Sequence, residues 1–496
     1  MKIQSLMAAV ALAASSAGAM AQAAPPAPAD STGAQADLVQ RVEALTEAQI
    51  KGSHDLAGLG RLGQIYAAQN DMQRFAWVLQ RSAELLPNSG DLKLQLAMVY
   101  ARQGDKTRAY DTLIRMQSQG FGYDIAKDQR FDPVHGTKVW DYIVANLQVN
   151  AKQFGEGKVA HTLPKGDYLF DALAWDPANK RLLVGSARDG HVRSIDAQGR
   201  IADFIVPNAA NGLWGVDAMA VDPAHTRLFV ASSATAIYQG FNGDNAGKAG
   251  IFEFAMPSGK FLRKYAFPES DGAHRLTELV AGGNGAVYAA DAGRKQVYKL
   301  ENGAIRSIFG NDKLTRISGM ALSGDGHILY LADYAIGILG FDLATGQAFA
   351  PPYDPSRLVL GGIVAMAWYD GTLAIVEDGM VPKRVMRLQL AKDGRSIVSA
   401  MPLDVAHPEF TTLGAATIAD DKLFYITNYQ AALYDIHGVL VEAGKLKPTQ
   451  IFRSNLRFAW GRSGVSGGPT PIAHDKPGSE RKVDFAPGVK PPSEKH

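Results

Sequence analysis

A phrase of two apolar runs joined by a short polar turn recurs along this chain. Residues 171–186 read DALAWDPANKRLLVGS, and residues 217–232 read DAMAVDPAHTRLFVAS. Each phrase opens with an acid, continues as an apolar run and reverses at an Asp-Pro turn before a second apolar run, a pattern typical of paired strands. Wording repeated this closely indicates a repeated structural unit.

Four more copies of the phrase start near residues 277, 318, 364 and 413. The six copies are about 40 to 60 residues apart, which is the spacing of propeller blades with several strands each. We therefore expect a six-bladed β-propeller over residues 158–453. A sandwich or a barrel would not explain six recurrences of one phrase.

A propeller also has to close its ring, because an open ring leaves strand edges unpaired. We expect residues 158–163, KVAHTL, to complete the last blade beside residues 449–452, TQIF. The sequence does not show which of the two strands is outermost.

Upstream of the propeller the apolar pattern repeats every 34 residues. Three residues that recur at this interval are paired as Leu62 with Leu96, Gly63 with Ala97, and Tyr66 with Tyr100. This period is that of tetratricopeptide-like helical repeats, which we expect over residues 37–150. About two repeats fit within 53–121, with single helices near 37–51 and 137–148. Such repeats bind a peptide or protein partner on a concave surface, and a helical spacer without a ligand is the alternative.

The two ends of the chain differ from the rest in composition. Residues 1–21, MKIQSLMAAVALAASSAGAMA, combine a lysine, a short apolar stretch and a small-x-small ending, which predicts a cleaved signal peptide. We expect a disordered linker over 22–36 and a disordered tail over 454–496. No other long apolar run follows, so we expect no transmembrane segment in the mature chain and a periplasmic or secreted protein. A formal net charge of +2 gives no reason to expect nucleic acid as a partner, and the chain has no cysteine for disulfide or thiol chemistry.

The innermost strand of each blade begins at the mouth of the central channel. By alignment, the six residues at this address are Asp171, Asp217, Thr277, Ser318, Val364 and a position near Leu413. We therefore expect two neighbouring carboxylates at a mouth that could hold a small-molecule ligand, with Glu278 one residue beyond its address. The acids that end the second strands, such as Asp291 and Asp333, recur too regularly for specific chemistry, and we expect them to accept hydrogen bonds from backbone amides.

Phrases such as FDALAWDP and LWGVDAMAVDP resemble the gluconolactonase and senescence-marker family of six-bladed propellers over about 158–453. The resemblance implies a calcium or similar divalent ion over the channel. Carried over by position, Asp171 keeps an acid where the family has one. Ser318 stands where the family has a metal-binding asparagine, and Val364 where it has an aspartate.

Two insertions near the mouth add candidate groups. GFNGDNAGKAG, residues 240–250, offers Asp244 as an oxygen ligand, so the predicted metal ligands are Asp171, Asp217 and Asp244; an ordinary polar turn is the alternative. ESDGAHRLTE, residues 269–278, places His274 near Glu278, and these two are the predicted catalytic residues. Charges paired locally in a solvated loop are the alternative there.

Two functions fit these features. The first is a non-catalytic extracytoplasmic binding or scaffold protein, whose helical repeats and propeller together grip a protein, peptide or small ligand. The second resembles the gluconolactonase family: a calcium-dependent hydrolase of lactones or esters. In it, an ion at Asp171 and Asp217 polarises the carbonyl while His274 or an acid activates water.

Overall fold

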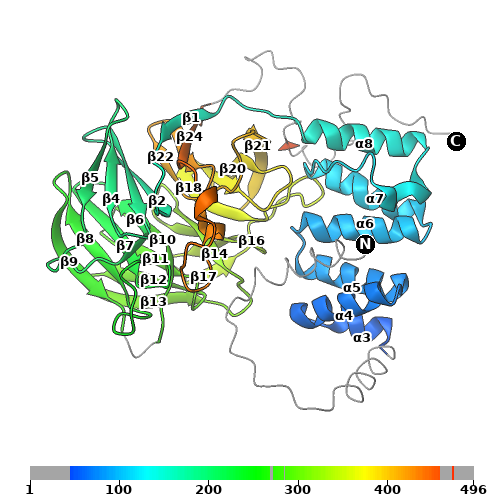
Figure 1. Cartoon of the computed structure of the whole chain (residues 1–496), viewed down its shortest axis with the longest axis horizontal. Helices are drawn as coiled ribbons and strands as arrows, with labels where there is room; N and C mark the ends of the chain where they lie inside the picture. Colours follow the sequence, from blue (N-terminus) through cyan, green and yellow to red (C-terminus); the bar gives the residue numbers. More distant parts are fainter. Residues whose placement is uncertain (1–44, 269–271, 284, 458–471, 474–496) are drawn as a thin grey trace. The chain divides into compact units, whose positions relative to one another are not determined.

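The computed structural model describes residues 45–268, 272–283, 285–457 and 472–473. The predicted signal peptide and linker, and most of the predicted tail, lie outside these ranges. The chain divides into two compact units, with the boundary between Asn150 and Ala151. Figure 1 shows the helices of the first unit in blue and cyan and the strands of the second from teal through green and yellow to orange.

The first unit is helical. Its elements are α3 (Glu47–Gly52), α4 (Leu56–Ala68), α5 (Met72–Leu85), α6 (Gly90–Arg102), α7 (Lys106–Ser118), the 3-10 helix η1 (Gln129–Val134) and α8 (Lys138–Asn150).

The two helical pairs repeat at the predicted interval. Helices α4 and α6 start 34 residues apart (56 and 90), as do α5 and α7 (72 and 106). The amino-terminal caps repeat as well: Asp71 accepts a hydrogen bond from the Arg74 N–H at 3.0 Å, and Asp105 accepts one from the Arg108 N–H at 2.9 Å. The expected helix near 137–148 is α8. The tetratricopeptide class itself stays a prediction.

The second unit is a six-bladed β-propeller. Blade one contains β2 (Phe170–Asp176), β3 (Arg181–Ser186), β4 (Val192–Ile195) and β5 (Ile201–Ile205); blade two contains β6 (Gly215–Val221), β7 (Arg227–Ser233), β8 (Ala249–Ala255) and β9 (Lys260–Ala266). Blade three contains β10 (Leu276–Ala281), β11 (Val287–Asp291), β12 (Gln296–Glu301) and β13 (Ala304–Gly310); blade four contains β14 (Ile317–Leu322), β15 (Ile328–Asp333), β16 (Gly337–Asp342) and β17 (Gln347–Phe349). Blade five contains β18 (Ile363–Tyr369), β19 (Thr372–Glu377), β20 (Arg384–Leu390), β21 (Ile397–Val405) and β25 (Ile472–Ala473).

The sixth blade joins strands from both ends of the propeller. It is ordered β22 (Ala416–Ala419), β23 (Lys422–Ile426), β24 (Gln450–Asn455) and β1 (Lys158–Thr162), so β1 is the outermost strand. This confirms the predicted closure and settles the order of its two strands. Strand β24 also continues to Asn455, two residues beyond the predicted boundary at 453.

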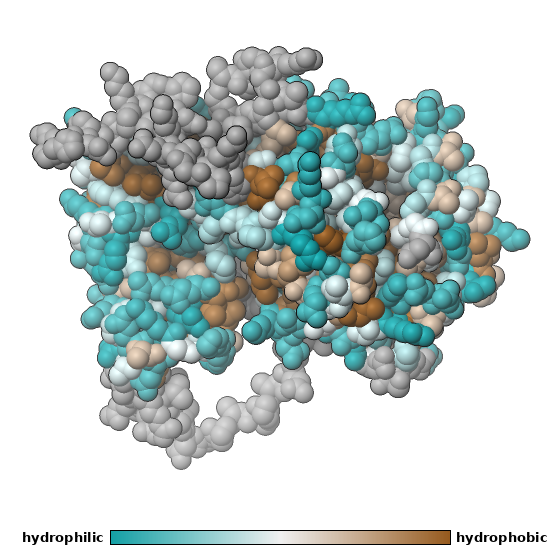
Figure 2. Space-filling model, turned by 180° about the vertical axis from the view of Figure 1, so that it is seen from behind, coloured by the Kyte–Doolittle hydropathy of each residue, from teal (hydrophilic) through white to brown (hydrophobic). Residues whose placement is uncertain are grey.

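Apolar packing explains why the strands read as continuous apolar runs. Each of the six interfaces between neighbouring blades holds its own cluster of buried apolar side chains. A strand inside a blade therefore buries side chains on both faces, which requires apolar residues without alternation. The face visible in Figure 2 is a mixture of hydrophilic areas and smaller hydrophobic ones. Among the described residues, no helix combines the length and apolar character needed to cross a bilayer.

Candidate functional site: the mouth of the central channel

Five of the six innermost strands carry a β-bulge where they begin. The strand pairing skips one residue between Phe170 and Ala172 in blade one, and it skips one at the same place in blades two to five. The skipped residues are Asp171, Asp217, Thr277, Ser318 and Val364, five of the six addresses that the sequence alignment named. A bulge leaves its extra residue unpaired and redirects the side chain, so the bulges form one ring at the channel mouth.

Two members of this ring link neighbouring blades. The Thr277 hydroxyl donates to the Ile317 carbonyl at 3.1 Å, and the Ser318 hydroxyl donates to the Ile363 carbonyl at 2.6 Å. Each accepting carbonyl precedes the bulge of the next blade, so these two hydroxyls tie blades three, four and five together. In blade six, strand β22 starts later, and the Leu413 N–H instead donates to Asp378 at 2.7 Å.

The two aspartates of the ring are half-buried and have different partners. Asp171 accepts a hydrogen bond from the Tyr429 hydroxyl at 3.0 Å. Asp217 Oδ2 is buried without a hydrogen-bond partner among the described residues. Burial raises the pKa of Asp171, although Tyr429 and the charges of two arginines oppose this rise. Burial raises the pKa of Asp217 well above its usual range, and the negative charge of Asp171 raises it further. Hydrogen bonds from Ser233 oppose this rise.

Glu278 differs from its equivalents in the other blades. The residue that follows the bulge is Ala172, Ala218, Gly319 or Ala365 in blades one, two, four and five. Glu278 alone among these five places an acid in the small-residue layer directly below the ring. Burial, with the negative charge of Asp171, raises the pKa of Glu278 to about 8, against the opposing charge of Arg316. Glu278 is therefore mostly protonated at neutral pH.

Asp171, Asp217 and Glu278 line one end of a channel that runs along the innermost strands. Its volume is about 510 Å³, within the range of small-molecule sites. Trp175, His225 and Trp368 line the wall farther along the strands. Small side chains between these levels, such as Ala174 and Ala220, keep the channel open.

A loop from the sixth blade supplies Tyr429 to this mouth. The connection between β23 and β24 is held to blade one by Arg188, which donates to the Gly438 carbonyl at 2.9 Å and pairs with Asp167 at 3.0 Å. The Tyr434 hydroxyl donates to the same Asp167 at 2.8 Å. Sequence reasoning missed Tyr429, because it stands 258 residues from Asp171 and outside the repeated phrase.

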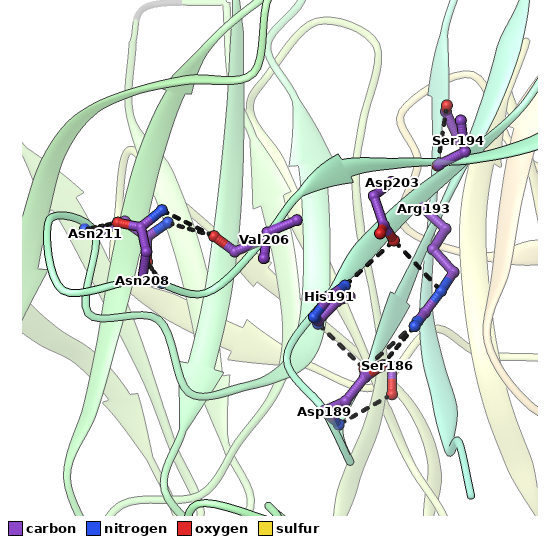
Figure 3. Close-up of polar contacts among 10 residues, drawn as sticks. Ser186, Asp189, His191, Arg193, Ser194, Asp203, Val206, Asn208 and Asn211 are labelled. Atoms are coloured by element: carbon purple, nitrogen blue, oxygen red, sulfur yellow. Dashed lines mark hydrogen bonds and ion pairs between the residues drawn. The ribbon is translucent and has the colours of Figure 1, made fainter. Parts of the chain in front are cut away.

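Arg188 itself projects from a turn that is held by polar contacts. Figure 3 shows Arg193 between Asp189 and Asp203, with nitrogen to oxygen distances of 2.6 and 3.7 Å, and His191 directed at Asp203 at 3.2 Å. Ser186 Oγ accepts the backbone N–H groups of Arg188 and Asp189, each at 3.3 Å. The β3–β4 turn is therefore a rigid base for the ion pair with Asp167.

The structure does not bring His274 to the mouth. Its Nδ1 lies 2.7 Å from Asp291, and its ring packs on Phe267 with centroids 4.8 Å apart. The side chain is buried and does not line the channel. His274 thus lies behind the channel wall, paired with Asp291 at the end of the second strand of the blade. The pairing with Glu278 expected from the sequence is not formed.

The aspartates that end the second strands have the expected structural role. Asp291 accepts the N–H groups of Arg275 and Arg294, and Asp333 accepts those of Thr315 and Arg316. These bonds fix the turns that lead into and out of the mouth.

Asp244 lies in the connection between β7 and β8 and is exposed. Its N–H donates to Asn242 Oδ1 at 2.9 Å, and Asn245 Oδ1 accepts the Asn242 N–H at 2.9 Å. The amide oxygens thus serve the turn itself, which favours the polar-turn alternative.

The described residues do not fit the calcium site that the family resemblance implies. No three histidine, aspartate or glutamate side chains in the described ranges are gathered so that they could hold a metal ion. Calcium takes six to eight oxygen ligands, and the unpartnered Asp217 Oδ2 is a single donor. Asp171, Asp217 and Asp244 therefore stay predicted ligands without a common centre, and no step below uses a metal.

Comparison with known proteins identifies no family for this chain. No family model matches the chain, and no curated protein matches it. Among solved structures, a calcium-binding regucalcin from Agrobacterium tumefaciens is 16% identical, with 60% of this chain and 96% of that chain covered and a TM-score of 0.41. A gluconolactonase from Xanthomonas campestris is 14% identical, with 62% and 92% covered and a TM-score of 0.40. A virginiamycin B lyase from Staphylococcus aureus is 16% identical, with 54% and 82% covered and a TM-score of 0.38. These likenesses assign no activity to this chain.

Proposed function

We propose that the propeller is a hydrolase of lactone or ester type, with its reaction centre at the acid-lined mouth. The observation that supports this most is the position of Glu278, which lines the channel where blades one, two, four and five have Ala or Gly and where burial raises its pKa to about 8. Strongly shifted carboxyl groups in a cavity are typical of catalytic acids and bases.

The proposed reaction needs two proton transfers. Water adds to the carbonyl carbon, and the bond between that carbon and the alcohol oxygen breaks. Asp171, oriented by Tyr429, takes the proton of the attacking water, and Glu278 gives its proton to the departing oxygen. The proton on Asp171 returns to Glu278 through solvent, so one water is consumed and an acid and an alcohol are formed.

The substitution Glu278→Gln tests this proposal. We expect a loss of about 100-fold or more in kcat/KM for aldonolactones or aryl esters, because the side-chain amide of glutamine is too weak an acid to transfer a proton to the departing oxygen. For the wild type we expect activity to fall as pH rises past about 8, the pKa at which Glu278 loses its proton. Hydrolysis is followed across pH, with the folded state checked by circular dichroism.

Glu301→Gln, an exposed substitution at the end of β12 in the same blade, is the matched control. Full activity in Glu278→Gln would refute the role of this acid. The assay is also run in EDTA and in millimolar calcium, and a strict calcium requirement would favour the metal-dependent mechanism instead.

A non-catalytic binding or scaffold protein is the second candidate. The connection between β23 and β24 exposes three aliphatic side chains, Ile436, Val439 and Val441, at 75%, 55% and 58%. Neighbouring exposed apolar residues are typical of contact surfaces, and the helical pairs offer a further surface for a peptide or protein partner. A chain that starts at Ala151 tests the helical part: if it captures partners as well as the whole chain does, the helical unit is a spacer.

A further inference from the structure

We propose that Arg275 and Arg316 form an anion-binding pair at the channel mouth, which selects ligands that carry a carboxylate or phosphate group. Only the statement that this ligand is a substrate rests on the proposed function. Binding of an anion by the two arginines is a separate claim.

The two arginines occupy the same address in neighbouring blades. Arg275 stands two residues before the bulge residue Thr277, and Arg316 stands two residues before Ser318. The backbone N–H of each is held by the aspartate that ends the second strand of its blade, at 3.2 Å for Arg275 and 2.9 Å for Arg316. Both side chains therefore start from equivalent, fixed points on the rim.

Their charges reach across the channel. Arg275 and Arg316, on blades three and four, both lower the pKa of Asp171, which belongs to blade one. The charge of Arg275 also acts on Asp217, and that of Arg316 acts on Glu278. Because such effects weaken with distance, both guanidinium groups belong on the rim near these acids, outside the residues that line the channel itself.

Both guanidinium groups are available to a ligand. Each arginine is exposed, and neither forms an ion pair within the described part of the chain. Arg316 lies over the Tyr334 ring at 4.5 Å, which limits its freedom without neutralising it. Burial raises the pKa of the acids beneath, which disfavours their charged forms.

The two arginines set the charge of the ligand. Arginine forks bind carboxylate and phosphate oxygens in pairs. The ligand class is therefore a small molecule with one carboxylate or phosphate end.

Gluconate and sorbitol are the test probes, because they share a carbon skeleton and differ by one carboxylate. Titration calorimetry on the full mature chain should show gluconate binding at least about tenfold tighter than sorbitol, a difference that shrinks with added salt. Arg275→Gln and Arg316→Gln should each weaken gluconate binding about tenfold and leave sorbitol binding unchanged. Sorbitol 6-phosphate is the third probe, and tighter binding than gluconate would identify phosphate as the preferred group.

Arg306→Gln is the matched control, an exposed arginine on β13, the outermost strand of blade three. Equal binding of gluconate and sorbitol, no binding of either anionic probe, or wild-type gluconate affinity in both Arg275→Gln and Arg316→Gln would overturn the inference. The two proposals can fail separately: if the wild type shows no hydrolysis but gluconate binding still depends on the arginines, the hydrolase proposal alone fails.

Discussion

Deleting residues 158–162 is expected to abolish the cooperative melting of the propeller. These residues are β1, which pairs with β24 from Lys158 opposite Arg453 to Thr162 opposite Gln450. Without β1, the edge of β24 is left with unpaired N–H and C=O groups, and the ring is closed only by side-chain packing. Calorimetry and near-ultraviolet circular dichroism measure the loss.

A single substitution next to β1 gives a graded form of the same test. Leu163 is fully buried between the sixth and first blades, and its N–H donates to the Thr449 carbonyl at 2.8 Å. Leu163→Ala should cost about 2–5 kcal/mol of unfolding free energy. The control Val159→Ala, on β1 but 36% exposed, should change it by about 0.5 kcal/mol or less. Wild-type melting of the deletion variant would show that β1 does not close the ring.

Arg384→Met is expected to destabilise the propeller by about 3–5 kcal/mol, because it leaves a buried acid without its partner. Arg384 Nε lies 2.5 Å from Glu377 Oε2, and the side chains are 5% and 0% exposed. A second donor of Arg384 reaches the Val359 carbonyl at 3.0 Å. Chemical denaturation at several pH values measures the effect.

The pH dependence has a defined sign. Burial raises the pKa of Glu377 above its usual value even beside Arg384, and losing the arginine charge raises it further. The folded state then holds a proton that the unfolded state releases, so the stability of the variant is greatest in acid and falls as pH rises through the unfolded pKa toward the folded one.

The double variant Arg384→Met with Glu377→Gln removes the uncompensated charge. It should recover most of the lost stability and remove the pH dependence that Glu377 adds in the single variant. Equal destabilisation of the single and double variants would show that packing by Arg384, rather than its charge, is what matters.

The sequence predicted the parts of the fold that depend on local pattern. Strands buried on both faces need continuous apolar runs, and turns between them need residues such as Asp, Asn, Gly and Pro, so the six blades could be found from the repeated phrase. The 34-residue interval of the helical pairs could be found in the same way. Alignment of the phrases also located the positions of the mouth residues, since it identified the bulge residue in five blades.

What the sequence by itself determined, then, was the number of blades and the residues that begin each innermost strand, because both follow from a phrase repeated along the chain. The need to pair every strand edge predicted the closing segment, but not which of its two strands is outermost. Only the tertiary structure decided which side chains meet. Tyr429 reaches Asp171 from 258 residues away, and His274 turns to Asp291 behind the channel wall instead of facing Glu278. Closure of the ring and the bulges at the mouth determine these neighbours, and both depend on contacts between segments that no local pattern records.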